Sequence, residues 1–191
     1  MRIVAGRFKG KSLDAPKGMA TRPTTDRVRE ALFNVLTHGA PEIVFGEGRA
    51  LDLFAGSGAL GLEALSRGAR YCLFIEEDAG ARGTIRRNVE VLGLTGATKI
   101  WRRDATRPGP IGTMTPFDLV FCDPPYGKGL GPRAILAALD GGWLASGATV
   151  VLEDKAGELP NWPRDLIDQD LVEIDRRRYG DTEIAIARYE R

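Results

Sequence analysis

The chain has 191 residues, 43% hydrophobic and 28% charged, which is the composition of an ordinary globular protein with one main domain. Its net charge of +1 excludes nothing, but the two cysteines, Cys72 and Cys122, lie in separate apolar runs without metal-ligand spacing, which excludes a disulfide scaffold and a zinc module. No apolar stretch approaches the roughly 20 residues of a membrane span, and the first residues carry no apolar signal core. We therefore expect a cytoplasmic protein that does not contact a membrane.

The charge is distributed unevenly along the chain. Residues 1–30 carry eight Lys or Arg against three acidic residues, a net charge of +5, whereas the remaining 161 residues carry a net charge of −4. A basic end on a slightly acidic body is typical of a protein that docks a polyanion. The alternative is a solvated surface, because charge runs often serve only solubility.

The first elements are two short strands, predicted at residues 2–5 and 11–14 and joined by the basic, glycine-flanked turn GRFKG. Together with a Pro-punctuated stretch they form a basic N-terminal hairpin extension over residues 1–23, and residues 24–191 form the main domain. A helix follows, since Thr24 and Thr25 offer N-cap hydroxyls, and it ends near Gly39. Its apolar stripe consists of Val28, Leu32, Val35 and Leu36.

From residue 50 onward, apolar strands alternate with helices. The strands are predicted at 50–54, 71–75, 99–101, 117–122 and 149–153, and the helices at 59–66, 81–92 and 133–139. The segments 171–175 and 183–188 alternate apolar and polar residues, as an antiparallel hairpin does. This pattern predicts an α/β fold: a Rossmann-like, doubly wound, mostly parallel seven-stranded sheet with an antiparallel C-terminal hairpin. Ligands in such folds bind outside the carboxyl ends of the strands.

The first loop at such an end has the sequence DLFAGSGALG over residues 52–61. Gly56 and Gly58 lack a Cβ, so the backbone can turn tightly into a helix and approach a ligand. Glu76, about 20 residues on, follows the next strand and is placed to accept hydrogen bonds from ribose hydroxyls. The combination favours an adenine nucleoside, with an unliganded glycine turn as the alternative. Asp104 follows the third strand, where it could accept from an adenine amine or cap a short helix.

The second chemical motif, Asp123-Pro124-Pro125-Tyr126, follows the fourth strand. Two prolines cannot continue a sheet, and they hold the Asp123 carboxylate, the Pro124 carbonyl and the Tyr126 ring in set directions. Two acceptors and an aromatic face suit a flat heterocycle with an NH2 group, because hydrogen bonds that favour a pyramidal nitrogen free its lone pair for attack on a methyl group. Such assistance contributes about 10² to 10⁴ in rate.

The glycine loop and DPPY resemble those of S-adenosylmethionine-dependent amino methyltransferases. The stretch RPTTDRVREALFN at 22–34, the opening RIVAGRFKG and the closing RYGDT at 178–182 are similar to the bacterial 16S rRNA (guanine-966-N2)-methyltransferase family. The resemblance implies transfer of a methyl group from S-adenosyl-L-methionine to the exocyclic N2 of guanine 966 of 16S rRNA. DPPY would then receive the guanine, and the remaining implied contacts to the cofactor are Thr24, Thr25, Asp52, Phe54, Ala55, Gly56, Ser57, Gly58, Glu76 (ribose) and Asp104 (adenine).

The partner implied is 16S rRNA, either naked or in a small-subunit particle. We expect Arg7, Lys9, Lys11 and Arg22 to contact its phosphates, and we expect a monomer that uses no metal. Three alternatives remain open at this stage. A similar turn serves adenine N6 or protein glutamine as the methyl acceptor; the glycine loop with Gly61 also fits a nicotinamide-dependent oxidoreductase; and a non-catalytic RNA-binding module would leave the pocket without a task.

Overall fold

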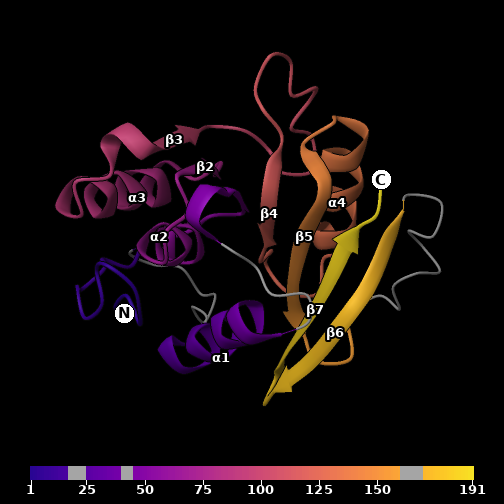
Figure 1. The fold of residues 1–191 in the computed structure, drawn as a ribbon, viewed down its shortest axis with the longest axis horizontal. Coiled ribbons are helices and arrows are strands. Elements are labelled where there is room, and N and C mark those ends of the chain that lie inside the picture. Colours follow the sequence, from indigo (N-terminus) through magenta and orange to yellow (C-terminus); the bar gives the residue numbers. More distant parts are fainter. Residues whose placement is uncertain (17–24, 40–44, 160–169) are drawn as a thin grey trace. The chain divides into compact units, whose positions relative to one another are not determined.

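Residues 1–102 build three parallel strands with helices packed on them (Figure 1). The strand order is β3-β2-β1, and the apolar residues of β1 and β2 are buried because a parallel sheet is covered on both faces. The strands are β1 Arg49–Leu53, β2 Tyr71–Ile75 and β3 Thr98–Trp101, and the helices that follow β1 and β2 are α2 Ala59–Ser66 and α3 Ala79–Val91. The computed structural model describes residues 1–16, 25–39, 45–159 and 170–191.

Helix α1, Asp26–His38, confirms the predicted N-terminal helix. The Thr25 hydroxyl accepts a hydrogen bond from the Val28 N–H over 3.3 Å, and the Gly39 N–H donates to the Val35 carbonyl over 2.7 Å. Of the predicted apolar stripe, Leu32 and Leu36 are buried and Val28 and Val35 are half-buried, and Phe33, which was not assigned to the stripe, is buried beside them. Two short 3-10 helices, at 45–47 and 95–97, were not predicted, because three-residue turns carry no periodic signal.

The N-terminal hairpin is present, but the strands predicted at 2–5 and 11–14 pair only through one antiparallel bridge, between Arg2 and Ser12. The pairing is short because the chain turns at Gly6 and Gly10, both of which have positive φ angles. The hairpin is anchored on α2 rather than on the sheet: the Val4 and Ala5 N–H groups donate to the Glu63 carboxylate over 2.9 and 3.0 Å.

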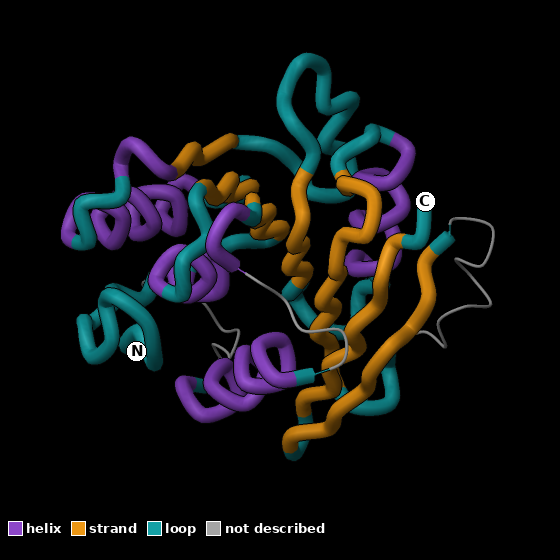
Figure 2. The backbone as a smooth tube through the Cα atoms, in the orientation of Figure 1, coloured by secondary structure: helices purple, strands orange, loops and turns teal. Residues whose placement is uncertain are grey.

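Residues 103–191 contribute four strands in the order β4-β5-β7-β6. They are β4 Phe117–Cys122, β5 Leu144–Lys155, β6 Leu171–Tyr179 and β7 Thr182–Tyr189. β4 and β5 are parallel, whereas β7 pairs antiparallel with β5 and with β6, and helix α4, Leu130–Asp140, packs against β4 and β5 (Figure 2). The described residues thus hold the seven strands of the predicted α/β fold, and the antiparallel C-terminal hairpin is confirmed.

Two element boundaries in this second unit differ from the prediction. Strand β5 begins at Leu144 and not at residue 149. The prediction began too late because residues 145–148 (ASGA) are small and polar and form no apolar run. Helix α4 begins at Leu130 rather than at residue 133. Gly129 adopts the left-handed conformation just before it, and Pro132 is tolerated in the first turn, where its missing N–H has no helical partner to lose.

Candidate active site

The backbone turns sharply at the end of β1. The predicted strand overran by one residue, because Phe54 leaves the strand with a φ of 59°, a conformation that bulky residues rarely adopt. Gly56 and Gly58 follow with φ angles of 57° and 77°, and α2 begins at Ala59. Strained backbone of this kind is concentrated at ligand-binding sites. The structure therefore confirms the tight strand-to-helix turn that the glycine spacing predicted.

Glu76 lies beside this turn, as predicted from its position after β2. One oxygen of its carboxylate accepts a hydrogen bond from the Gly56 N–H over 2.8 Å, and the other accepts from the Asp78 N–H over 2.8 Å. A carboxylate has room for about four such bonds, so two acceptor positions are left for hydroxyl donors. Glu76 thus holds the glycine loop in place through one of its two carboxylate oxygens.

Asp52 is buried in β1, with 1% of its surface exposed, and its carboxylate accepts a hydrogen bond from the Gly61 N–H over 3.0 Å. Burial raises the pKa of Asp52 to about 8; the charge of Glu76 acts in the same direction, and the Gly61 hydrogen bond opposes it. Asp52 therefore ties the strand to the first turn of α2, a structural task that the sequence did not indicate.

Gly61 sits where α2 crosses β2. A Cβ at this position would lie 2.5 Å from the Cys72 Sγ and 2.5 Å from the Phe74 ring, so only glycine fits. The third glycine of a nucleotide-binding fingerprint serves close packing of helix on strand in the same way.

Asn88 connects the glycine loop to the N-terminal hairpin. Its side-chain amide donates to the Ser57 carbonyl over 3.0 Å and to the Asp14 carbonyl over 3.1 Å, while its oxygen accepts from the Asp14 N–H over 2.8 Å. Asn88 is buried on α3. Sequence reasoning missed this residue, because nothing in its neighbourhood marks it out from other helical polar residues.

In the second unit, the Asp104 carboxylate accepts hydrogen bonds from the Thr106 N–H over 2.8 Å and from the Thr106 hydroxyl over 2.7 Å. These bonds, with the hydroxyl foremost, hold the pKa of Asp104 below its usual range, so it is a carboxylate at neutral pH. Residues 105 and 106 form a turn and not a helix, so Asp104 is not the helix cap that was one of its two predicted roles.

The DPPY segment follows β4 directly. Pro124 is buried while Asp123 and Tyr126 are half-buried, and a Cβ on Gly131 would lie 3.4 Å from the Pro124 ring, so the start of α4 is seated on this turn. The Tyr126 hydroxyl donates to the Glu153 carboxylate over 2.9 Å and lies 3.1 Å from the Thr182 hydroxyl. Burial, followed by the Glu153 charge, raises the pKa of Tyr126. The ring is thus fixed by strands β5 and β7, which sequence reasoning did not foresee.

Three of the predicted phosphate contacts, Arg7, Lys9 and Lys11, are exposed on the N-terminal hairpin. The Arg7 guanidinium lies 4.4 Å from the centre of the Phe8 ring. Arg22, the fourth, and Thr24 lie outside the described residues, and the Thr25 hydroxyl caps α1.

Comparison with known proteins decides the family. The family model described as "Conserved hypothetical protein 95" matches residues 1–188. "Putative rRNA methyltransferase YlbH" of Bacillus subtilis (strain 168) is 40% identical over 190 residues, covering 97% of each chain. "Ribosomal RNA small subunit methyltransferase D" of Escherichia coli (strain K12) is 41% identical over 164 residues, 85% of this chain and 79% of that one. The chain belongs to this methyltransferase family.

The solved structures agree with this family assignment. The "Putative methyltransferase yhhF from Escherichia coli" matches with a TM-score of 0.80 and 34% identity over 100% of this chain and 98% of that one. A hypothetical protein from a Thermus species matches with a TM-score of 0.73 and 29% identity over 97% and 98% of the two chains. The family resemblance drawn from the sequence motifs and the predicted fold class are thereby confirmed.

Within residues 1–16, 25–39, 45–159 and 170–191, no helix is both long and apolar enough to cross a membrane. The same ranges contain no group of three or more His, Cys, Asp or Glu side chains arranged to hold a metal ion.

Proposed function

We propose that this methyltransferase transfers a methyl group from S-adenosyl-L-methionine to the exocyclic N2 of guanine 966 in 16S rRNA. The observation that carries the proposal is the DPPY turn, in which Tyr126 is fixed through its hydroxyl while Asp123 and the Pro124 carbonyl stand at the same strand end. The names of the relatives from Bacillus subtilis and Escherichia coli support ribosomal RNA as the substrate class.

The glycine loop fits the methyl donor. A Cβ added to Gly56 would contact no atom outside its own turn, so the backbone there is open to a ligand. Glu76 keeps free acceptor positions for ribose hydroxyls. Thr24, Thr25, Asp52, Phe54, Ala55, Ser57, Gly58 and Asp104 complete the set that we assign to the cofactor. When bound, the cofactor supplies an electrophilic methyl group attached to a sulfonium.

The residues of DPPY assist the acceptor. Asp123 and the Pro124 carbonyl accept hydrogen bonds from the two hydrogens of the guanine N2, which draws the nitrogen lone pair out of conjugation with the ring. The N–C bond forms as the methyl–sulfur bond breaks, and the nitrogen then releases one proton to the Asp123 carboxylate or to water. Pro125 keeps the turn rigid, and Tyr126 stacks on the base. Hydrogen-bond assistance of this kind contributes about 10² to 10⁴ in rate.

The substrate must present an unpaired base, because N2 of a stacked and paired guanine cannot enter a pocket. Stacking on Tyr126 returns about 1 to 3 kcal/mol of the cost of flipping the base. The basic hairpin of residues 1–23, with Arg7, Lys9, Lys11 and Arg22, contacts phosphates near the target, and residues 24–191 form the catalytic domain. The enzyme acts on RNA in the cytoplasm as a monomer.

The test is methyl transfer from labelled S-adenosyl-L-methionine to small-subunit RNA or particles that lack the modification, followed by nucleoside analysis. We expect N2-methylguanosine at position 966. N6-methyladenosine would instead identify the alternative acceptor that a similar turn can serve, and absence of any transfer to either substrate would contradict the proposal.

Two variants locate the chemistry. Asp123→Ala should lower transfer by at least about 10²-fold while leaving cofactor binding, measured by calorimetry, within about twofold. Asp140→Ala, at the exposed end of α4, is the matched control and should retain full activity. Full turnover of Asp123→Ala would show that the active site is misplaced.

A further inference from the structure

The first unit contains a pocket of about 380 Å³, and its lining includes none of the residues assigned to catalysis. Gly68, Ala69 and Arg70 line it just before the amino end of β2, and Ala97 lines it just before β3. The glycine loop, by contrast, follows the carboxyl end of β1. Because these strands are parallel, the pocket and the glycine loop lie at opposite ends of the same strands.

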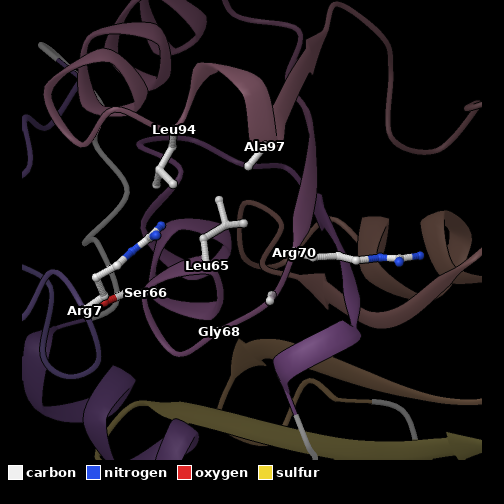
Figure 3. Close-up of a pocket in the computed structure, with 8 residues that line it drawn as sticks. Arg7, Leu65, Ser66, Gly68, Arg70, Leu94 and Ala97 are labelled. Atoms are coloured by element: carbon white, nitrogen blue, oxygen red, sulfur yellow. The ribbon is translucent and has the colours of Figure 1, made fainter.

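The floor of the pocket is apolar. Leu65 and Leu94 contribute to it with 2% and 3% of their surfaces exposed (Figure 3). Ala69, with 8% of its surface exposed, also lines the pocket. A volume of this size falls within the range of small-ligand sites, which are mostly apolar with a few polar groups at the edge.

Arg7 of the N-terminal hairpin lies at the edge of the pocket and provides its positive charge. The Arg7 N–H donates to the Ser66 carbonyl over 2.8 Å, and the Phe8 N–H donates to the Ser66 hydroxyl over 3.0 Å. A Cβ on Gly6 would lie 2.1 Å from the Ser66 carbonyl oxygen, so only glycine permits this close approach. In Figure 3 the Arg7 side chain extends toward Leu65 and Leu94.

The cation of Arg7 is available to an external anion. Arg7 is exposed, and it makes no ion pair with any acidic side chain of the described residues. Arg70 also lines the pocket, but in Figure 3 its guanidinium points away, and it pairs with Glu47 over 3.5 Å at the surface. Surface pairs of this kind contribute little free energy, so Arg70 can exchange Glu47 for a phosphate.

We infer that this pocket binds one unpaired nucleotide of the substrate RNA, other than the target guanine. The base lies on the floor formed by Leu65, Ala69 and Leu94, and its phosphate pairs with Arg7. RNA is favoured over a protein partner because the same hairpin exposes further cations, Lys9 and Lys11. A single-stranded nucleotide is favoured over a duplex because bases of an RNA helix are stacked and cannot enter a pocket. The inference rests on the proposed function, which supplies the RNA.

The test separates the base from the phosphate. Ala97→Phe and the smaller Ala97→Leu fill the pocket without changing charge, and both should raise the Kd for unmodified small-subunit RNA, by about 5- to 100-fold for phenylalanine, with an unchanged salt slope. Arg7→Ala should instead reduce the slope of log Kd against log salt by about 0.7. Gly6→Ala, which keeps Arg7 but displaces it, should act like Arg7→Ala. Arg86→Ala, which removes an exposed arginine of α3 away from the pocket, is the matched control.

The outcomes distinguish this inference from the proposed function. Unchanged RNA affinity in both Ala97 variants, with their thermal unfolding intact, overturns the pocket while methyl transfer by the unsubstituted protein still supports the function. An effect seen only with subunit particles and not with naked RNA also overturns it, because a protein side chain would then be the occupant. Loss of affinity in the Ala97 variants of a protein that transfers no methyl group would support the pocket and contradict the function.

Discussion

The Tyr126 hydroxyl donates a hydrogen bond of 2.9 Å to the Glu153 carboxylate, which joins the turn after β4 to the end of β5. Burial and the charge of Glu153 raise the pKa of Tyr126, so the hydroxyl is a donor at neutral pH. Thr182, at the start of β7, lies 3.1 Å from the same oxygen. The aromatic face that we assign to the guanine is therefore held from two further strands, and the turn alone does not set its orientation.

This contact predicts different losses for two variants of Tyr126. Tyr126→Phe keeps the stacking ring and removes the hydrogen bond, so kcat/KM should fall about tenfold. Tyr126→Ala also removes the stacking surface, so kcat/KM should fall by a further factor of about 5 to 160, which corresponds to about 1 to 3 kcal/mol. Steady-state kinetics on unmodified particles measures both, with the KM for the methyl donor as the internal control. Equal losses in the two variants would contradict stacking as the role of the ring.

Asp52 predicts how stability depends on pH. Its pKa of about 8 in the folded protein exceeds its ordinary value of 3.8, so between these values the folded state keeps a proton that the unfolded chain has released. The free energy of unfolding should therefore fall as pH rises from about 4 to 8, by up to about 1.4 kcal/mol per pH unit from this group. Asp52→Asn does not titrate and keeps an oxygen for the Gly61 N–H. Urea unfolding between pH 5 and 8 should show a shallower slope in this variant; identical slopes would refute the assignment.

The packing of α2 on β2 predicts that Gly61 cannot be replaced. The added methyl group of Gly61→Ala would press on Cys72 and Phe74, and overpacking of this kind lowers the free energy of unfolding by about 1 to 3 kcal/mol. Gly96→Ala is the control, because no atom lies within 4 Å of its would-be Cβ and its φ is not positive, so its stability should change by less than about 0.5 kcal/mol. Thermal unfolding measures the stability of both variants. An equal loss of stability in Gly61→Ala and Gly96→Ala would contradict the packing explanation.

We expect the attachment of the N-terminal hairpin to depend on the buried Glu63 carboxylate. Besides the Val4 and Ala5 N–H groups, its carboxylate accepts from the Arg67 Nε over 2.9 Å and lies 3.7 Å from the Nε of the fully buried Arg29. Glu63→Gln removes one of the two carboxylates beside Arg29, which still pairs with Asp26 over 2.7 Å, and it should lower the free energy of unfolding by about 1 to 3 kcal/mol.

Hydrogen exchange of the hairpin amides tests the same variant locally. The Val4 and Ala5 amides should lose protection in Glu63→Gln but not in Glu90→Gln, which changes an exposed glutamate of α3. Retained protection in Glu63→Gln would show that other contacts anchor the hairpin.

The elements that sequence reasoning predicted correctly are those with local signals. Helix α2 and strand β2 have the predicted bounds, because each is an apolar run with a clear local end: Gly68 follows α2, and the acidic residues 76–78 follow β2. The start of β5 was missed, since residues 145–148 carry no apolar run and only the pairing of Leu144 with Phe117 of β4 marks where the strand begins. Glu153, Asn88 and Glu63 were missed for a related reason: Tyr126, Ser57 and Val4, which they bind, lie 27, 31 and 59 residues away from them in the chain.

The amino-acid sequence by itself determined the α/β class, the positions of the glycine loop and DPPY, and the family. Turns, caps and strand ends depend on neighbouring residues, so local patterns record them. Only the tertiary structure decided that Asp52 serves α2, that Tyr126 is held by Glu153, and that Arg7 stands at the rim of an apolar pocket. Burial and hydrogen bonds between distant segments depend on how the whole chain packs, and no local pattern records them.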